Sequence, residues 1–163
     1  MSFEFGFAKR RYNEDNPSLD PYFFWCGREH YDLYKAFSLL GTPVLVAEDE
    51  YMKFYEYEID VEKLNFIPLL FEQLYDNKHY EKIIKLCLFD DGFVQTYIDS
   101  LPIEEKADLR LAFILDHADD TINRICVELF NVFEYGSDII TALYNAYIKM
   151  LEDGVKTVWL YGD

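Results

Sequence analysis

Apolar and polar residues alternate with two different periods along this chain, and the two periods predict two kinds of element. At the N-terminus Phe3, Phe5 and Phe7 alternate with small or polar residues. A period of two is typical of a strand with one buried face. We therefore expect a strand over residues 3–8. The apolar segment 155–161 is similarly β-like, whereas the segment 22–26 fits either a buried strand or the lead-in to a helix.

Residues 42–59 predict a β-hairpin. Pro43 suits the first position of a strand, and Glu48-Asp49-Glu50 would form the turn into residues 51–59. In the second strand, a period of two separates one face from the other. One face contains Tyr51, Lys53, Tyr55, Tyr57 and Ile59, and the other contains Met52, Phe54, Glu56, Glu58 and Asp60. We expect Met52 and Phe54 to face the core and the three acids to lie outside it.

Between the hairpin and the C-terminal strand, apolar residues recur at intervals of three and four, which predicts helices. The strongest stripe starts at Ile122 and ends at Phe133, and the next helix starts after Ser137 and ends at Gly154. Helical spacing of this kind covers residues 27–40, 68–75, 77–88, 93–101, 104–113, 122–133 and 139–151.

These elements predict an α+β fold. We expect a small antiparallel sheet from the N-terminal strands and the C-terminal strand, packed on about six short helices. The chain has 163 residues, of which 51% are hydrophobic, so one domain over residues 1–163 can bury a core without disulfides.

Charge narrows the choice of partners. The chain has 31 acidic and 15 basic residues, which gives a formal net charge of −16. Direct binding of nucleic acid or of an anionic membrane needs Lys and Arg on phosphates, so both are disfavoured. A basic protein is the favoured partner, although high net charge also serves solubility alone. The oligomeric state is left open.

The cysteines and the N-terminus favour a cytoplasmic location. Cys26, Cys87 and Cys126 are widely spaced among apolar neighbours, so we expect buried thiols in a reducing compartment. The N-terminus shows no secretory signal, and no segment has the length of a membrane span. No residue pattern indicates a metal or another cofactor.

Two charged clusters have simple structural interpretations. The basic residues Lys9, Arg10 and Arg11 are expected to pair with the protein's own acids at a strand end, with a phosphate site as the sharper alternative. In residues 116–120, Asp119 or Asp120 is expected to cap the following helix. The stretch 119–123, DDTIN, resembles the aspartate-rich magnesium motif of terpene synthases, but the second metal motif of that family is missing.

Enzymatic sequence motifs for nucleophile elbows, P-loops and dinucleotide binding are missing from the chain. An enzyme would need a site that the fold assembles around His30 or His117 and nearby acids. We expect the protein not to be an enzyme. A small enzyme with such a fold-assembled site is kept as an alternative.

The acidic hairpin is the strongest candidate for a binding site. Acids beside tyrosines suit a surface that meets Arg and Lys, because carboxylates supply charge-assisted hydrogen bonds and Tyr supplies rigid apolar area. The candidate partner-binding residues are Glu48, Asp49, Glu50, Tyr55, Glu56, Tyr57, Glu58 and Asp60.

The function that this charge pattern favours is that of an acidic inhibitor. It would neutralise a basic protein that acts on nucleic acid, as immunity proteins of nuclease toxins and DNA-mimic anti-defence proteins of phages do. An acidic structural or adaptor subunit is the other alternative.

Overall fold

The computed structural model describes residues 3–11, 21–27, 31–88 and 91–162, and contacts divide the chain into two compact units. The sheet unit comprises residues 1–65 and 145–163, and the helical unit comprises residues 66–144. Within the described residues there are five strands and seven α-helices, with about 53% helix and 23% strand, which confirms the α+β class. The expectation of a single domain stays a prediction.

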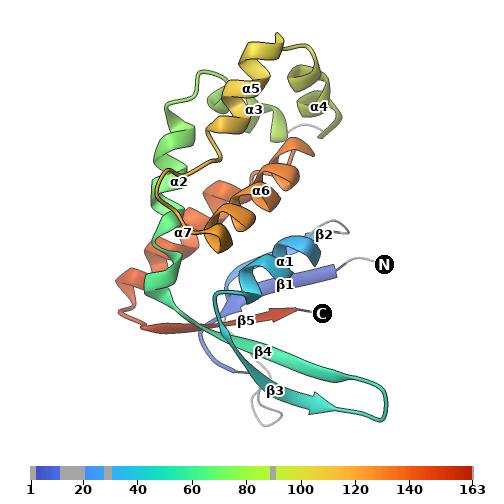
Figure 1. The fold of residues 1–163 in the computed structure, drawn as a ribbon, viewed down its shortest axis with the longest axis vertical. Coiled ribbons are helices and arrows are strands. Elements are labelled where there is room, and N and C mark those ends of the chain that lie inside the picture. The colour runs from blue at the N-terminus through green and yellow to red at the C-terminus, as the bar shows by residue number, and fades with distance from the viewer. Residues whose placement is uncertain (1–2, 12–20, 28–30, 89–90, 163) are drawn as a thin grey trace. The chain divides into compact units, whose positions relative to one another are not determined.

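The sheet is antiparallel throughout and has the strand order β2-β1-β5-β4-β3 (Figure 1). The C-terminal strand is therefore the central one, between an N-terminal pair and a hairpin. This arrangement confirms a sheet built from both ends of the chain. The strands are β1 (Phe3–Ala8), β2 (Pro21–Gly27), β3 (Thr42–Glu48), β4 (Lys53–Asp60) and β5 (Thr157–Gly162).

One face of the sheet forms the core of this unit. Phe7 lies opposite Phe23 in β2 and Leu160 in β5, and all three side chains are buried. Phe7 also packs edge-on against Phe37 of α1 (Tyr31–Ser38), with ring centroids 5.1 Å apart. The alternation of Phe3, Phe5 and Phe7 thus correctly predicted the strand, because the register turns every second residue toward this aromatic cluster.

Helix α7 (Ile139–Glu152) ends in the glycine motif that its sequence predicted. Gly154 has a positive φ of 66°, and its N–H donates to the carbonyl of Leu151. The N–H of Val155 donates to the carbonyl of Met150, which completes a Schellman motif. The turn directs the chain into β5.

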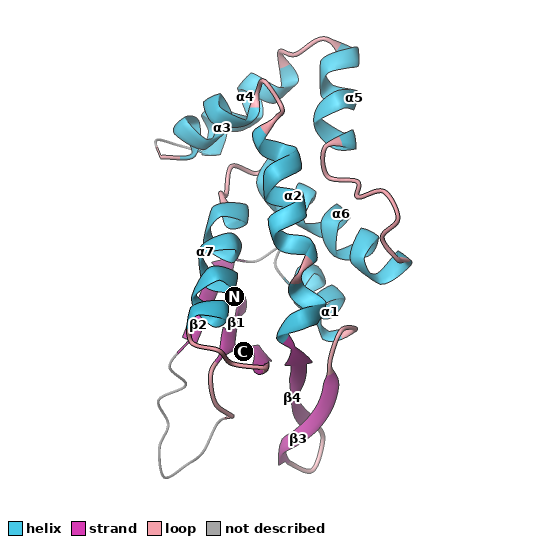
Figure 2. Ribbon diagram, turned by 90° about the vertical axis from the view of Figure 1, so that its left-hand side faces the viewer, coloured by secondary structure: helices cyan, strands magenta, loops and turns pink. Residues whose placement is uncertain are grey.

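The helical unit contains five helices and the first residues of α7, and Figure 2 shows them in cyan. Its core includes Ile125, Leu129 and Phe133 of α6, as the helical stripe predicted, and Phe133 packs against Tyr80 and Phe113. The five helices are α2 (Phe66–Tyr75), α3 (Tyr80–Cys87), α4 (Asp91–Asp99), α5 (Ile103–Leu111) and α6 (Asp120–Glu134).

Two aspartates in the helical unit cap the N-termini of helices. The Asp119 carboxylate accepts a hydrogen bond from the Ile122 N–H at 2.9 Å, so the capping interpretation of this aspartate-rich stretch is confirmed. At the start of α7, Asp138 accepts a hydrogen bond from the Thr141 N–H at 3.2 Å, so the cap is Asp138 and not the predicted Ser137.

The separate helices predicted over residues 77–88 and 93–101 are present, since α3 ends at Cys87 and α4 begins at Asp91. The apolar residues at the ends of two helices are not buried, because the exposed fractions are 82% for Leu88, which was expected to face inward, and 71% for Tyr75. Both residues lie at or beyond the last residue of a short helix, where the apolar stripe is no longer covered.

The cysteines divide between the two units. Cys126 is buried and Cys87 is half-buried, and burial raises the pKa of the Cys126 thiol to about 12 and that of Cys87 to about 11. Cys26 is exposed in β2, an edge strand of the sheet, so the expectation that all three are buried was wrong for this residue. None of the helices that the structure describes combines the length and apolar character needed to cross a bilayer.

Candidate functional site

The predicted hairpin is formed by β3 and β4, and its outer half extends beyond its neighbour in the sheet (Figure 1). β4 pairs with β3 from Lys53 to Glu58, but it pairs with β5 only from Tyr57 to Asp60. Within the described residues, the segment 53–56 is therefore paired on one side only. β3 is an edge strand, and Pro43 and the register shift between Leu45 and Ala47 interrupt its outer edge.

Apolar and aromatic side chains are exposed in this outer half. The exposed fractions are 86% for Tyr51, 58% for Met52, 46% for Phe54 and 39% for Tyr55. The expectation that Met52 and Phe54 face the core was wrong. The period of two is present, but the core of the sheet does not extend past Tyr57, where β5 stops pairing with β4. An apolar group of this kind on a projecting hairpin is typical of an interaction surface.

Among the predicted acids of the hairpin, Glu48, Glu50 and Glu58 are exposed. Asp49 has a structural role, because its carboxylate accepts hydrogen bonds from the N–H groups of Tyr51 and Met52 at 2.8 and 2.7 Å. This Asx-type turn fixes the hairpin tip.

Glu56 is a correction to the predicted interface, since only 5% of the residue is exposed. Its carboxylate lies 4.0 Å from the guanidinium of Arg11, which stacks over the Trp159 ring at 5.3 Å and donates to the carbonyl of Leu45 at 3.4 Å. Arg11 therefore covers Glu56 on the side of β4 that was expected to face solvent. With the 3.8 Å contact of Lys9 and Asp153, this confirms that the basic cluster pairs with the protein's own acids.

The two predicted tyrosine anchors differ. Tyr55 is exposed, whereas Tyr57 is partly buried and its ring lies edge-on to Tyr34 with centroids 6.2 Å apart. Burial, followed by the proximity of Tyr57, raises the pKa of Tyr34 to about 12. Tyr57 thus contributes to packing, and Tyr55 is the anchor available to a partner.

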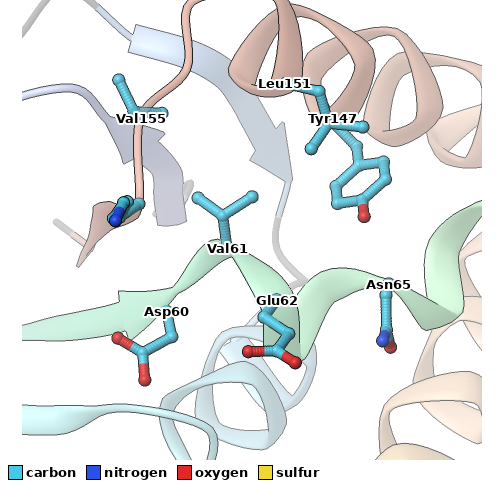
Figure 3. A pocket seen from close by; sticks show the side chains of 8 residues that line it. Asp60, Val61, Glu62, Asn65, Tyr147, Leu151 and Val155 are labelled. Atoms are coloured by element: carbon cyan, nitrogen blue, oxygen red, sulfur yellow. The ribbon is translucent and has the colours of Figure 1, made fainter.

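The last predicted acid, Asp60, lines a pocket of about 620 Å³ at the inner end of the hairpin (Figure 3). All of its lining residues belong to the sheet unit. They come from the end of β4, the 3₁₀ helix η2 (Val61–Leu64), the end of α7 and the turn into β5. The lining residues are Asp60, Val61, Glu62, Asn65, Tyr147, Leu151, Val155 and Lys156.

Of the residues that line this pocket, only Asp60 was predicted from the sequence. The spacing of Asp60 and Glu62 was a usable signal, since two acids directly after a strand often lie at one sheet edge. No local pattern could have linked them to Tyr147 or Lys156, which the fold brings back from the far end of the chain.

A second polar cluster lies in the helical unit. The Tyr97 hydroxyl lies 2.6 Å from Nδ1 of His79, and Nε2 of His79 lies 3.5 Å from a Glu105 carboxylate oxygen. Lys78 forms an ion pair with the same carboxylate, and Lys82 lies 4.8 Å from the centre of the Tyr97 ring. Because Glu105 can only accept, the tautomer with a proton on Nε2 fits both contacts, and Nδ1 then accepts from Tyr97.

This cluster shifts the pKa values of its members in the expected directions. The hydrogen bond from Lys78 holds the pKa of Glu105 below its ordinary value, and burial together with the Glu105 charge raises the pKa of Tyr97. His79 and Tyr97 are residue types used in acid–base catalysis, but here each one is a partner of the other. The members of the cluster are therefore mostly paired with one another, although Nε2 of His79 makes only the 3.5 Å contact with Glu105 and no hydrogen bond.

The predicted enzymatic residues are not brought together. His117 is exposed in a left-handed turn with a φ of 66°, so the segment around it is not the continuous helix that would align Asp116 and Asp120 with it. His30 lies outside the described residues. Across the part of the chain that the structure describes, no three His, Cys, Asp or Glu side chains gather closely enough to hold a metal ion.

Comparison of the chain with protein-family models, curated proteins and solved structures finds no match.

Proposed function

We propose that this chain is an acidic binding protein that neutralises a basic, nucleic-acid-acting partner protein through the β3–β4 hairpin. The observation that supports the proposal is the outer half of the hairpin, where acids and exposed aromatic rings occur together beyond the end of β5. Glu48 and Glu50 are the acids of this outer half, and Tyr51, Phe54 and Tyr55 are its aromatic residues. Glu58 adds a third exposed acid nearer the base of the hairpin, where it lies opposite Trp159 of β5.

These two kinds of side chain have complementary functions in recognition. Carboxylates form charge-assisted hydrogen bonds with Arg and Lys, and the net charge of −16 accelerates encounter with a positive surface. Tyr and Phe supply apolar area at low entropic cost, so they suit the centre of an interface. A basic groove that normally holds a nucleic-acid backbone offers both features, which favours a nuclease toxin or a nucleic-acid-processing defence complex as the partner.

Site-specific crosslinking tests this function. Tyr51 is replaced by p-benzoylphenylalanine, and the protein is irradiated in a lysate of its host at NaCl concentrations from about 0.05 to about 0.5 M. Tyr75 of the helical unit provides a matched control, because it is also an exposed tyrosine. We expect a basic protein to be captured at Tyr51, with a yield that falls as the salt concentration rises, and not at Tyr75.

Inhibition is then measured with the purified partner. We expect the chain to suppress the partner's nucleic-acid processing, and the triple variant Glu48→Gln, Glu50→Gln, Glu58→Gln to suppress it at least about tenfold less well. Capture of the same proteins at Tyr51 and Tyr75, or inhibition that the triple variant leaves unchanged, would contradict the proposal.

A further inference from the structure

The pocket at the inner end of the hairpin is lined by a mostly buried tyrosine whose hydroxyl has no partner among the described residues. Tyr147 has an exposed fraction of 8%, and its hydroxyl forms no hydrogen bond with any residue that the structure describes. Figure 3 shows the hydroxyl directed toward the side of the pocket where Glu62 and Asn65 lie. The hydroxyl oxygen itself is not fully enclosed, so it is reached from the pocket, where a bound ligand could replace the solvent around it.

Asp60 is also left free by the local structure. It occupies the N-cap position of η2, where an aspartate normally accepts a backbone N–H, but its side chain forms no capping hydrogen bond. The backbone around it is held by a different contact, the hydrogen bond from the Val61 N–H to the carbonyl of Lys156 at 2.9 Å. The Asp60 carboxylate is therefore positioned without being used.

Glu62 adds a second free carboxylate on the same side. The side chains of Asp60 and Glu62 point the same way in Figure 3, and neither forms an ion pair within the described chain. Lys156 supplies one positive charge to the lining, so the lining retains a net negative charge. The groups that can accept a hydrogen bond thus outnumber the donors.

Apart from Asn65, the rest of the lining is apolar. Val61 is buried and points toward the side of the pocket that contains Leu151 and Val155 (Figure 3). A volume of about 620 Å³ lies within the range of roughly 300–1,000 Å³ that is common for small-ligand sites. The pocket therefore suits a ligand with a cationic head rich in donors and a short apolar stem.

We propose that this pocket binds a guanidinium group, and that under the proposed function the group belongs to an arginine side chain of the basic partner. A guanidinium has five N–H donors in a planar fork, which can serve the two carboxylates and the Tyr147 hydroxyl oxygen together. Its propyl stem would pack along Val61 and Leu151. An ammonium has only three donors and is more strongly hydrated, so it fits this arrangement less well.

Small probes test the chemistry on the full chain. Methyl and side-chain amide NMR signals of Val61, Leu151 and Asn65 are followed during titration with N-acetyl-arginine-N-methylamide. The matched citrulline compound has nearly the same shape but no charge, and it serves as the ligand control. We expect saturable shifts of these signals with the arginine compound and none with the citrulline compound. Equal shifts with both compounds, or none with either, would overturn the inference.

Variants test the named side chains. Tyr147→Phe keeps the ring and removes the hydroxyl, and we expect the arginine compound to bind about three- to tenfold more weakly. The pair Asp60→Asn and Glu62→Gln is expected to weaken binding by more than about tenfold. The control pair Glu72→Gln and Asp76→Asn removes the same charge from a second acid-lined pocket, in the helical unit, and is expected to change affinity by less than about twofold. An equal loss in the control pair would indicate general charge attraction and overturn the site.

The source of the guanidinium is distinguished by a third probe. Agmatine represents a free small molecule, and the blocked arginine represents a protein-borne side chain. Tighter binding of the blocked arginine supports a partner's side chain, and tighter binding of agmatine supports a small metabolite and overturns the link to the partner. If crosslinking at Tyr51 fails while the blocked arginine binds, the proposed function is wrong and the pocket remains. If crosslinking succeeds and no guanidinium binds, the pocket inference alone is wrong.

Discussion

The cluster around Tyr97 in the helical unit and the pocket lined by Tyr147 in the sheet unit contain the same kinds of side chain. These side chains contact one another in the cluster but, within the described part of the chain, have no partners in the pocket. Each one contains a tyrosine, a carboxylate and a lysine. In the helical unit, the Tyr97 hydroxyl contacts His79, and Glu105 contacts both His79 and Lys78. In the sheet unit, neither the Tyr147 hydroxyl nor the carboxylates of Asp60 and Glu62 have a partner among the described residues. Capacity to bind a ligand depends on hydrogen-bonding groups left unused, and residue types alone do not reveal it.

Matched Tyr→Phe variants in the cluster and in the pocket are expected to give the largest difference in the free energy of unfolding. Tyr97→Phe leaves Nδ1 of the mostly buried His79 without its 2.6 Å contact, and we expect the free energy of unfolding to fall by about 2 kcal/mol. Tyr147→Phe removes no contact, so we expect a change within about 0.5 kcal/mol. Urea unfolding followed by circular dichroism measures both, and equal losses would contradict the distinction.

The hairpin offers the same comparison between two carboxylates on one strand. Glu56 is buried beside Arg11, and Glu56→Ala is expected to lower the free energy of unfolding by about 1.5 kcal/mol. Glu58→Ala is the control, because Glu58 is exposed, and its effect should stay within about 0.5 kcal/mol. A larger effect at Glu58 than at Glu56 would show that Arg11 does not stabilise the strand as described.

Helix capping extends the comparison to adjacent aspartates. Asp119 accepts the Ile122 N–H, so Asp119→Ala should cost about 1 kcal/mol, and Asp119→Asn should recover most of it. Asp120→Ala removes a charge near the helix N-terminus without removing the cap and should cost about 0.5 kcal/mol. Thermal unfolding of the three variants in one buffer ranks their losses of stability. A larger loss for Asp120→Ala than for Asp119→Ala would contradict the capping role of Asp119.

Acid should weaken the contribution of Glu105 to the cluster around Tyr97, and this is the smallest of the expected changes in stability. The folded-state pKa of Glu105 is lowered by Lys78, so its contribution is present above the ordinary carboxyl value of 4.5 and is lost as the pH falls through the lowered value. The stability difference between the wild type and Glu105→Gln should therefore shrink below a pH of about 4.5. Urea midpoints across this pH range provide the measurement.

Much of the fold was predictable because the chain's local preferences agree with it. The phenylalanine alternation at Phe3–Phe7, the stripe from Ile122 to Phe133 and the stop at Gly154 each act over one or two turns or a few strand residues. The hairpin was predicted on the same basis. Its burial was not, because Met52 and Phe54 are apolar residues whose strand extends past the sheet that would cover them.

The candidate site was only partly predictable for a related reason. The exposed acids Glu48, Glu50 and Glu58 were predicted from the acidic pattern of the hairpin, and the exposure of Glu48 and Glu50 follows from their place at the turn. Glu56 was misplaced because its partner Arg11 lies 45 positions earlier, and charge pattern alone does not pair distant residues.

The sequence by itself determined the fold class, most helix positions, the caps at Asp119 and Gly154, and the excess of acid. These depend on local spacing and on composition, which a chain expresses before it folds. Only the tertiary structure decided that β5 is the central strand, that Glu56 is covered, and that Tyr147 meets Asp60 in one pocket. Each of these requires two segments far apart in the chain to come together, and long-range pairing leaves no signal in either segment alone.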